Sequence, residues 1–502
     1  MTARLLVIGL DGGDDRILTG LMDAGRLPAL ASLRERGGAV PVETEADLMP
    51  EAAWPVLLSG AGMGEDDMFH FYTFDPETMG LRFRREAGPQ REPFWLHLPG
   101  RGEGALVSEI PELHPHPESR AEETCCWHSH APPHRPFSTS RRLAGTLRAH
   151  GSPLPLGDPD YSRAPSLEHD LSLADRLARS AGQRARALRA AARGRTSVCA
   201  VFHELHTAVH ALGHHYDPEH WYRPFNPEPE LLFRVYEAVD EALAPLLKDF
   251  SDANVAVVAA RGSRPADTAG DLLEELLAWG GLLARAGEAT AGQSSVSPTE
   301  RLRRLVPPDL RRRIALRVLP QTVQHRLAAR ALRERYAWPA TRAFPLPTWT
   351  IGLVRVNVAG REAAGVVPPE ELDSVLQEAT RLIQETVDAD TGGPLAAQVI
   401  ALRREVSARD PRPDLLVEWA PTRPPLAARH PRLGTWSVRR APTHAWSHHR
   451  SPGLVLLAGP GVRRIGAADE QDRLGLAPTL LALAGLRERP TASPAWSDLV
   501  AQ

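Results

Sequence analysis

Short apolar runs of strand length recur along this chain, and longer helical patterns separate them. Each run is bounded by Gly or polar residues, as a strand buried on both faces of a parallel sheet is. The runs lie at 4–10, 104–108, 197–202, 254–259, 414–418 and 453–458. The helical patterns lie at 15–36, where Pro28 interrupts the pattern, and at 168–193, 230–249, 369–386 and 471–485. This alternation predicts an α/β fold with a doubly wound, mainly parallel sheet that helices cover on both faces.

One long segment breaks the alternation. At 502 residues the chain exceeds the size at which one hydrophobic core stops growing, so an insertion into the α/β body is expected. Residues 263–345 are helical in pattern, rich in arginine and without a convincing strand. We therefore predict a first part of the α/β core at 1–262, a helical, Arg-rich insertion or cap at 263–345, and a second part of the core at 346–502. The charge runs of the insertion are interpreted as solvated helix faces.

Net charge, hydropathy and cysteine spacing limit which partners and which cellular compartment are expected for this protein. The formal net charge of −3, from 59 basic and 62 acidic residues, argues against a nucleic-acid-binding surface. No apolar stretch reaches the roughly 18 residues that a membrane span requires, and the N-terminal run is interpreted as a strand, not a signal peptide. Cys125, Cys126 and Cys199 form neither a CxxC pair nor a disulfide ladder. These features predict a cytoplasmic protein with no nucleic-acid or membrane partner, and they leave its oligomeric state open.

Several phrases of the sequence, read in order, resemble one enzyme superfamily. They are GLDGG with AGRLPALASL, AAWPVLLSG, YDPEH, RVYEAVDEAL, RVNVAGREAAGVV, PDLLVEW, HRSPGLVLLAGPGV and LAPTLLALAGL. Together they resemble the alkaline phosphatase superfamily, in particular its type I phosphodiesterases and nucleotide pyrophosphatases. The resemblance spans nearly the whole chain and implies a sheet of alkaline-phosphatase type. It also implies phosphoryl transfer, in which two metal ions flank a Thr or Ser nucleophile at the carboxyl end of the sheet.

Matched position by position, the resemblance indicates a site that is partly dismantled. Asp11, in GLDGG, matches the family's first carboxylate ligand. Pro50, which has no hydroxyl group, stands at the nucleophile's position, and Ala260 and Arg261 stand where the family has an Asp-His pair of ligands. The usual covalent mechanism is therefore not expected. Of the ligands to one of the two ions only Asp11 remains, so that ion's site is expected to be empty.

The ligands of the other ion are all histidines in this sequence. His206 and His210 match the family's Asp and His four residues apart, and a spacing of four puts both rings on one helix face. His449, or its neighbour His448, matches the last ligand, while His214 extends the helical stripe by one turn. Three histidines with an open fourth position are a recognised arrangement for catalytic zinc. We therefore predict one divalent metal ion, with zinc as the first candidate, on His206, His210 and His449. Asp11 is a further candidate ligand.

Three residues are candidates for catalysis. Arg261 either pairs with Asp11 and partly replaces the lost positive charge, or clamps an anionic substrate in a two-pronged way, or points into solvent from a decayed loop. Glu51, next to Pro50, is either a general base acting through water or a residue that favours the N-terminus of a helix. Asp11 is the only residue left of its ion's ligand set.

Two functions follow from this pattern. The first is a phosphodiesterase- or nucleotide-pyrophosphatase-like hydrolase, or a group-transfer enzyme, that acts on a small anionic substrate with a single metal ion and no Thr or Ser nucleophile. The alternative is a catalytically inactive pseudoenzyme that binds a ligand or a partner. The first predicts that replacing His210 by Ala abolishes metal binding, whereas replacing Asp11 leaves the metal content unchanged.

Overall fold

A computed structural model describes most of the chain. The described residues are 4–62, 72–83, 92–127 apart from 112, 114 and 126, 137–150, 166–265, 272–286, 323, 330, 332–348, 351–402, 410–420, 425–437, 447–465, 468–486 and 493–501. The chain forms two compact units, unit 1 from residues 1–68, 89–266 and 443–502, and unit 2 from residues 69–88 and 267–442. Cys126 lies outside the described residues. Among the described residues, no helix combines the length and the apolar character that crossing a membrane requires.

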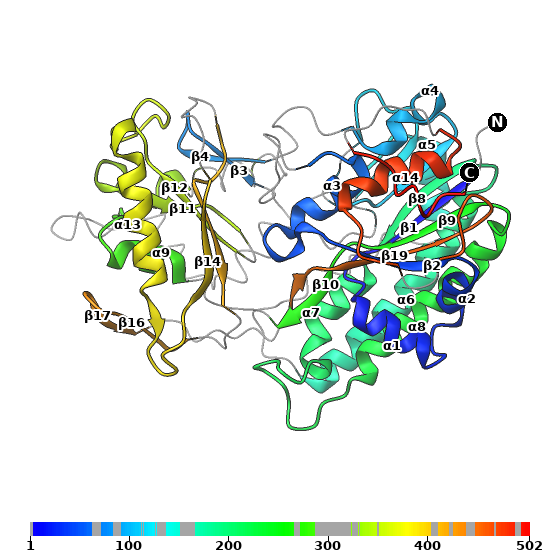
Figure 1. Ribbon diagram of the computed structural model, residues 1–502, viewed down its shortest axis with the longest axis horizontal. Coiled ribbons are helices and arrows are strands. Elements are labelled where there is room, and N and C mark those ends of the chain that lie inside the picture. The colour runs from blue at the N-terminus through cyan, green and yellow to red at the C-terminus, as the bar shows by residue number, and fades with distance from the viewer. Residues whose placement is uncertain are drawn as a thin grey trace. The chain divides into compact units, whose positions relative to one another are not determined.

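Unit 1 is built on an eight-stranded sheet of order β2-β19-β9-β1-β8-β5-β6-β7 (Figure 1). The five strands from β9 to β6 are parallel, whereas β2, β19 and β7 pair antiparallel with their neighbours. The strands are β1 Leu5–Leu10, β2 Gly38–Val42, β5 Ala105–Ser108, β6 Glu122–Cys125, β7 Phe137–Ser138, β8 Ser197–Phe202, β9 Asn254–Ala259 and β19 Gly453–Ala458. The predicted α/β fold with a mainly parallel sheet is confirmed.

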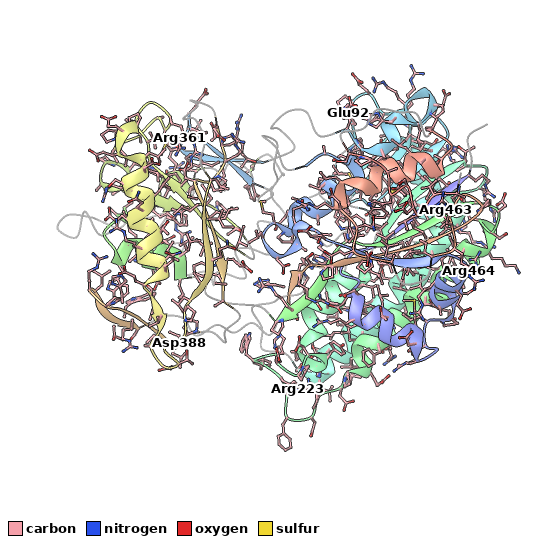
Figure 2. The ribbon with its side chains drawn as sticks, viewed as in Figure 1. Glu92, Arg223, Arg361, Asp388, Arg463 and Arg464 are labelled. Carbon is pink, nitrogen blue, oxygen red and sulfur yellow. The ribbon has the colours of Figure 1, made fainter. Side chains whose placement is uncertain are left out.

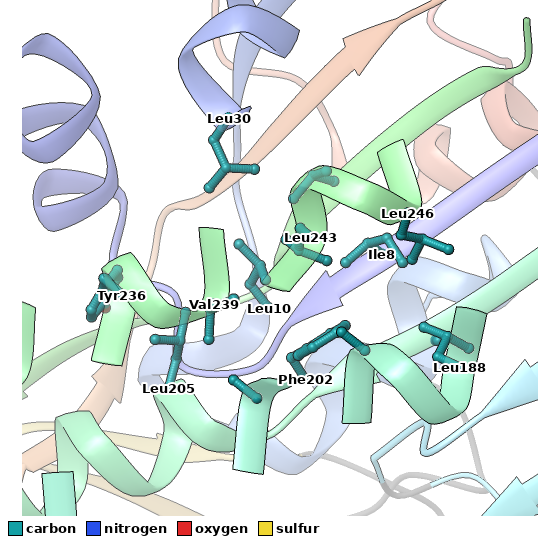
Figure 3. Packing of buried hydrophobic residues seen from close by; sticks show 14 of the residues in the cluster. Ile8, Leu10, Leu30, Leu188, Phe202, Leu205, Tyr236, Val239, Leu243 and Leu246 are labelled. Atoms are coloured by element: carbon teal, nitrogen blue, oxygen red, sulfur yellow. The ribbon is translucent and has the colours of Figure 1, made fainter. Parts of the chain in front are cut away.

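Helices cover both faces of this sheet. Because side chains alternate along a strand, Ile8 and Leu10 of β1 enter the cluster beneath α6 and α8, which Figure 3 shows, while Leu5 and Val7 pack on the opposite side with α3 and α14. The helices are α1 Asp15–Asp23, α2 Pro28–Arg36, α3 Ala53–Ser59, α4 Pro99–Gly102, α5 Arg141–His150, α6 Leu167–Ala191, α7 Glu204–Tyr216, α8 Glu230–Asp249 and α14 Leu476–Leu483. Pro28 opens α2, so the predicted interruption of the first helical pattern is present.

A two-stranded ribbon completes the part of unit 1 that positions the site. It pairs β10 Gly262–Pro265 with β18 Ser447–Arg450, antiparallel, in the register Ser263 opposite His449. The ribbon brings together two segments that are far apart in the sequence.

Unit 2 has a separate antiparallel sheet of order β11-β12-β15-β14. Its strands and helices are β3 Tyr72–Asp75, β4 Gly80–Phe83, α9 Leu273–Trp279, β11 Ala343–Pro345, β12 Gly352–Val356, α13 Leu372–Gln384, β13 Val387–Asp388, β14 Ala396–Ala401, β15 Leu415–Trp419, β16 Ala427–His430 and β17 Gly434–Ser437. The hairpin of β3 and β4 comes from a part of the sequence that precedes most of unit 1.

This division differs from the predicted one. The segment 263–345 was expected to be helical, but it begins and ends with strands, β10 and β11, and residues 287–322, 324–329 and 331 of it lie outside the described residues. The second part of the core was expected from residue 346, yet the structure returns to unit 1 at residue 443. The strand predicted at 414–418 and the helix at 369–386 exist as β15 and α13, but they belong to unit 2. An apolar period reveals that a strand exists, not which sheet it joins.

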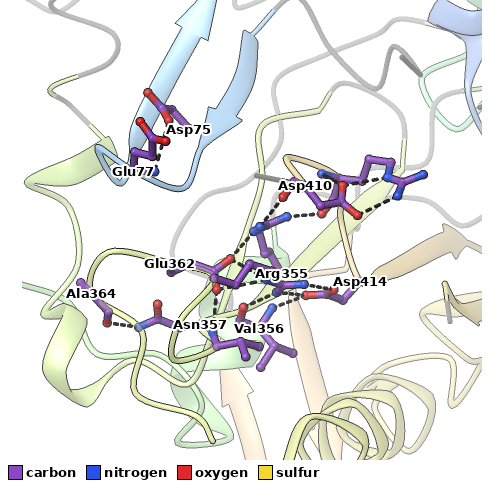
Figure 4. Close-up of polar contacts among 12 residues, drawn as sticks. Asp75, Glu77, Arg355, Val356, Asn357, Glu362, Ala364, Asp410 and Asp414 are labelled. Carbon is purple, nitrogen blue, oxygen red and sulfur yellow. Dashed lines mark hydrogen bonds and ion pairs between the residues drawn. The ribbon is translucent and has the colours of Figure 1, made fainter. Parts of the chain in front are cut away.

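A buried ion network holds the strands of unit 2 together (Figure 4). Arg361 makes a two-pronged contact of 2.7 Å with each carboxylate oxygen of Asp414, and Arg355 donates to Glu362 at 2.6 Å. Asp414 also accepts the backbone N–H of Val356 at 2.7 Å. The phrases RVNVAGREAAGVV and PDLLVEW therefore contribute to the packing of unit 2.

Candidate metal centre

The site lies where three neighbouring parallel strands end. Asp11 follows β1, His203 follows β8, and Arg261 comes two residues after β9. Because β9, β1 and β8 are adjacent and parallel, their carboxyl ends meet at one edge of the sheet. All three side chains are buried there.

Three histidines from two distant segments cluster beside this edge. His206 and His210 come from α7, one helical turn apart, and His449 comes from β18. All three are buried, and one nitrogen from each lies within 4.8 Å of the others. The predicted grouping of His206, His210 and His449 is present in the structure.

The hydrogen bonds of two of these rings fix which nitrogen carries the proton. Nδ1 of His210 faces the carbonyl oxygen of Ser447, and Nδ1 of His449 lies 3.3 Å from the carbonyl oxygen of Gly262. A carbonyl oxygen only accepts, so Nδ1 carries the proton in both neutral rings and Nε2 has a lone pair. These two Nε2 atoms lie 3.2 Å apart. Two lone pairs cannot hydrogen-bond to each other, but a cation between them satisfies both.

The geometry and the protonation states fit a zinc-class ion. Zinc–nitrogen bonds of about 2.0–2.1 Å in a tetrahedral site separate two ligand nitrogens by roughly 3.3 Å. Burial is the main cause that lowers the pKa of His206 and moves the pKa values of His210 and His449 well below the usual value of 6.5. The rings are therefore neutral near pH 7, as metal ligation requires.

The alternation of β18 distinguishes His449 from His448. Neighbouring residues of a strand point to opposite faces, so only one of them can join the rings of α7. His449 is that residue, with ring centroids 4.8 Å from His206 and 4.7 Å from His210.

Asp11 lies beside the histidine cluster and accepts contacts from several directions. Its Oδ1 accepts hydrogen bonds from Trp54 Nε1 at 3.0 Å and from Arg261 Nε at 2.9 Å. Its Oδ2 lies 3.1 Å from Nδ1 of His206 and 3.2 Å from Nδ1 of His203. Asp11 is not in the group of residues whose ligand atoms all lie within 4.8 Å of one another, and its role as a metal ligand stays a prediction. It is placed to orient the His206 ring, as carboxylates do for metal-binding histidines.

The charge of Asp11 is held by its neighbours. Burial on its own would raise the pKa of Asp11, but the positive charge of Arg261 and the contacts of His206 and His203 outweigh it and hold the pKa well below 3.8. Asp11 is therefore a carboxylate near neutral pH.

Arg261 is buried, with 2% of its surface exposed, so the alternative that it points into solvent is wrong. The predicted ion pair with Asp11 is confirmed by a distance of 2.8 Å between Arg261 Nη2 and Asp11 Oδ1. Arg261 Nη1 also donates to the carbonyl oxygen of Pro50 at 2.6 Å. The arginine thus links the backbone of Pro50 to the carboxylate of Asp11.

Glu51 lies in a short 3₁₀ helix, Pro50–Ala52, and is buried. Burial raises its pKa from 4.5 to about 7, an effect that the charge of Arg261 offsets only in part. A carboxyl group with this pKa exchanges its proton near neutral pH, as a general base or acid does. Its place at the start of a helix also agrees with the other interpretation, so both uses of Glu51 stay open.

His203 is a site residue that the sequence analysis did not find. Its Nε2 lies 2.8 Å from the carbonyl oxygen of Glu109, and its Nδ1 faces Asp11. Both ring nitrogens face oxygen atoms, so the ring is held between the backbone of Glu109 and the carboxylate of Asp11. The signal available in the sequence was its position directly after β8, equivalent to that of Asp11 after β1.

Comparisons with known proteins identify the fold. No family model matches the chain, and no curated protein sequence matches it. Among solved structures, alkaline phosphatase PafA matches with a TM-score of 0.54 at 10% identity, covering 100% of this chain and 99% of that one. Phosphonoacetate hydrolase from Sinorhizobium meliloti 1021 matches at 0.48 and 13% identity, with 96% of each chain covered. Human ectonucleotide pyrophosphatase/phosphodiesterase 5 matches at 0.49 and 10% identity, covering 99% and 100%. The match with PafA shows that the chain has an alkaline phosphatase-like fold.

Proposed function

We propose that this protein is a metal-dependent hydrolase or group-transfer enzyme that acts on a phosphoester-type bond of a small anionic substrate. It uses one divalent metal ion of the zinc class, on His206, His210 and His449, and forms no covalent intermediate at the family's usual position. The observation that supports the proposal best is the 3.2 Å separation of two Nε2 lone pairs whose Nδ1 atoms are both turned toward carbonyl oxygens.

The residues around the cluster have separate roles in this proposal. When bound, a divalent ion supplies Lewis acidity, which activates water and polarises a phosphoester oxygen. Asp11 holds the His206 ring through Nδ1, and Arg261 adds a buried positive charge near the substrate's negative charge. Glu51, with a pKa of about 7, accepts the proton of the attacking water at its carboxylate.

Neither Pro50 nor Ser59 offers a hydroxyl group turned away from the backbone, which is consistent with direct attack by water. Pro50 has no hydroxyl group, and its carbonyl oxygen is bonded to Arg261. The hydroxyl group of Ser59, in α3, is directed to the backbone of its own helix, where it donates to the carbonyl oxygen of Val56 at 3.4 Å.

A pseudoenzyme is the second candidate, and one specific observation favours it. Arg261 stands at a ligand position of the family's other ion and is bonded to Asp11 and to Pro50, so the polar groups of that half of the site already bind one another. A protein that uses this fold only to bind a ligand or partner could keep a site in which these polar groups bind one another.

Metal analysis combined with turnover tests the proposal. The wild-type protein, prepared without a His-tag or chelator, is expected to contain zinc and to hydrolyse a generic phosphodiester such as bis-p-nitrophenyl phosphate. His210→Ala is expected to lose the ion of this cluster and at least a hundredfold in rate, because removing one of three ligands leaves a much weaker site. His150→Ala, which removes an exposed imidazole on α5, is the matched control and is expected to change neither.

Two outcomes would count against the enzyme. A cluster that binds zinc but turns over neither phosphodiesters nor phosphomonoesters would favour the pseudoenzyme. A protein that takes up no metal even when zinc is supplied would contradict the proposal as a whole.

A further inference from the structure

A second buried cluster of potential ligands lies at the other end of α7. It consists of Asp170 of α6 and the neighbouring residues His214 and His215 of α7, and all three are buried. Oδ2 of Asp170 lies 3.1 Å from Nε2 of His215 and 3.4 Å from Nε2 of His214. His206 and His210 belong to the cluster one turn or more earlier on the same helix, and the residues of this second cluster are not part of it.

This cluster forms part of the wall of a pocket of about 410 Å³. The pocket lies between the start of α6, the end of α7 and the loop that follows α7, with Ser166, Trp221 and Asn226 among its lining residues. Arg223, labelled in Figure 2, belongs to the same loop and also lines it. Pockets of this size hold small ligands, and this one leaves room for water or a small molecule beside the cluster.

We propose that Asp170, His214 and His215 form a second binding site for a divalent transition-metal ion, with its open coordination positions facing this pocket. Two imidazoles and one carboxylate are a donor set that zinc and related divalent ions use when they keep positions open for water or a ligand. The 3.1 Å and 3.4 Å separations bracket the roughly 3.3 Å expected between two ligand atoms of a tetrahedral ion.

In the described part of the chain, the polar contacts of the His214 ring do not account for its burial. Only 1% of His214 is exposed, and its Nδ1 has no hydrogen-bond partner in the described part of the chain. Its contact with Asp170 is long, and a buried ring with a single long polar contact is poorly satisfied. A bound ion gives Nε2 of His214 a strong partner without moving α7.

Binding of an ion at this second site requires the His215 ring to change its tautomer. Its Nδ1 accepts the backbone N–H of Glu228 at 3.1 Å, so in the ion-free protein the proton is on Nε2, which donates to Asp170. An ion on Nε2 displaces that proton, and the ring then carries its proton on Nδ1, which breaks the bond to Glu228. Binding therefore moves the ring's proton from Nε2 to Nδ1, with no net release of a proton, and the backbone N–H of Glu228 loses this acceptor. This site is expected to bind zinc more weakly than the three-histidine cluster, where Nδ1 already donates.

Metal stoichiometry with paired variants tests the second site. Each protein is loaded with zinc alone, dialysed, and measured by elemental analysis, with circular dichroism to check its fold. Wild type is expected to hold two ions per chain, and His215→Ala and Asp170→Asn one each. Asp175→Asn, on the exposed side of α6 where Asp175 pairs with Arg234, is the matched control and keeps two.

The same series separates this proposal from the proposed function. If wild type and His215→Ala hold equal amounts of zinc, and Asp170→Asn does too, the second site is overturned. If His210→Ala still holds the wild-type amount while His215→Ala loses one ion, the second site stands and the three-histidine site fails.

Discussion

Asp11 accepts contacts from Trp54, Arg261, His203 and His206, and through the last of these it influences the candidate metal centre. This contact changes the expectation that an Asp11 variant keeps its metal content. Asp11→Asn should weaken zinc affinity about 10–100-fold, because the carboxylate that orients His206 Nδ1 is lost. The measurement is a competition titration with a coloured chelator.

The control for this variant also removes the positive charge of Arg261, which Asp11→Asn leaves unpaired. Asp11→Asn leaves Arg261 buried without its counter-charge, which destabilises the fold on its own. Combining it with Arg261→Met removes that charge, and the double variant should keep the weakened zinc affinity. An affinity restored to the wild-type value would show that Asp11 does not orient His206.

Glu51 gives a pH dependence whose sign follows from its burial. Its pKa is raised from 4.5 in the unfolded chain to about 7 in the folded protein, so the folded state holds the proton more tightly. Between these two values only the unfolded state ionises, so the contribution of Glu51 to stability falls as pH rises and is fully lost above about pH 7. The shift corresponds to a free energy on the order of 3 kcal/mol.

Glu51→Gln removes this titration. We expect the variant to gain stability relative to wild type as pH rises from about 5 to about 8, measured by urea unfolding with a chelator present in both proteins. A difference between the two proteins that does not change across this range would contradict the raised pKa.

At the scale of elements, helix α7 carries both candidate metal sites. Its residues His206 and His210 share one face because they are four residues apart, and His214 and His215 follow at its C-terminal end. The sequence analysis noticed His214 only as an extension of the stripe. The structure assigns it to Asp170, because α6 lies alongside α7 and brings that carboxylate to the end of the helix.

The ion network of unit 2 supports a prediction at the scale of elements. Asp414→Asn breaks the two-pronged pair between Arg361 and Asp414, the residue directly before β15, and leaves Arg361 with Glu362, 2.9 Å away, as its remaining counter-charge. The loss should cost about 1–3 kcal/mol in the free energy of unfolding. Denaturant unfolding measures this loss, and the zinc content should stay unchanged, because all ligands of both candidate sites belong to unit 1.

Asp373→Asn is the matched control, because it changes an exposed carboxylate on α13 and should alter the free energy of unfolding by less than about 0.5 kcal/mol. Equal losses in the two variants would show that the network contributes nothing beyond an ordinary surface charge.

For the whole molecule, the three-histidine cluster joins segments that are 239 residues apart, α7 and β18. An ion that binds only the folded state stabilises it, by about 2.7 kcal/mol when free zinc is a hundredfold above the dissociation constant. A chelator should therefore lower the midpoint of thermal unfolding of wild type, and the shift should be smaller in His210→Ala. The same shift in both proteins would show that this cluster does not link metal binding to folding.

The α/β fold and the strands β1, β5, β8, β9 and β19 of unit 1 could be predicted because their signal is local. A strand buried on both faces is a short apolar run, and the amphipathic period of α6 or α8 is readable within one helix. The boundary at residue 346 could not be predicted in this way, because β15 has the same apolar pattern as β9 but pairs with β12 and β14. Which strands pair with one another depends on contacts between segments that are far apart in the sequence.

The sequence by itself determined which groups are present at the site: the imidazoles of His206, His210 and His449, a proline without a hydroxyl group at position 50, and the guanidinium of Arg261. Only the tertiary structure decided how they act on one another. It turned the Nδ1 atoms of His210 and His449 toward backbone carbonyls, surrounded Asp11 with donors, and chose His449 over His448. The physical reason is that residue types follow from the order of the chain, whereas the proton on a ring, the pKa of Glu51 and the pairing of Asp170 with His214 depend on neighbours that lie far away in the sequence.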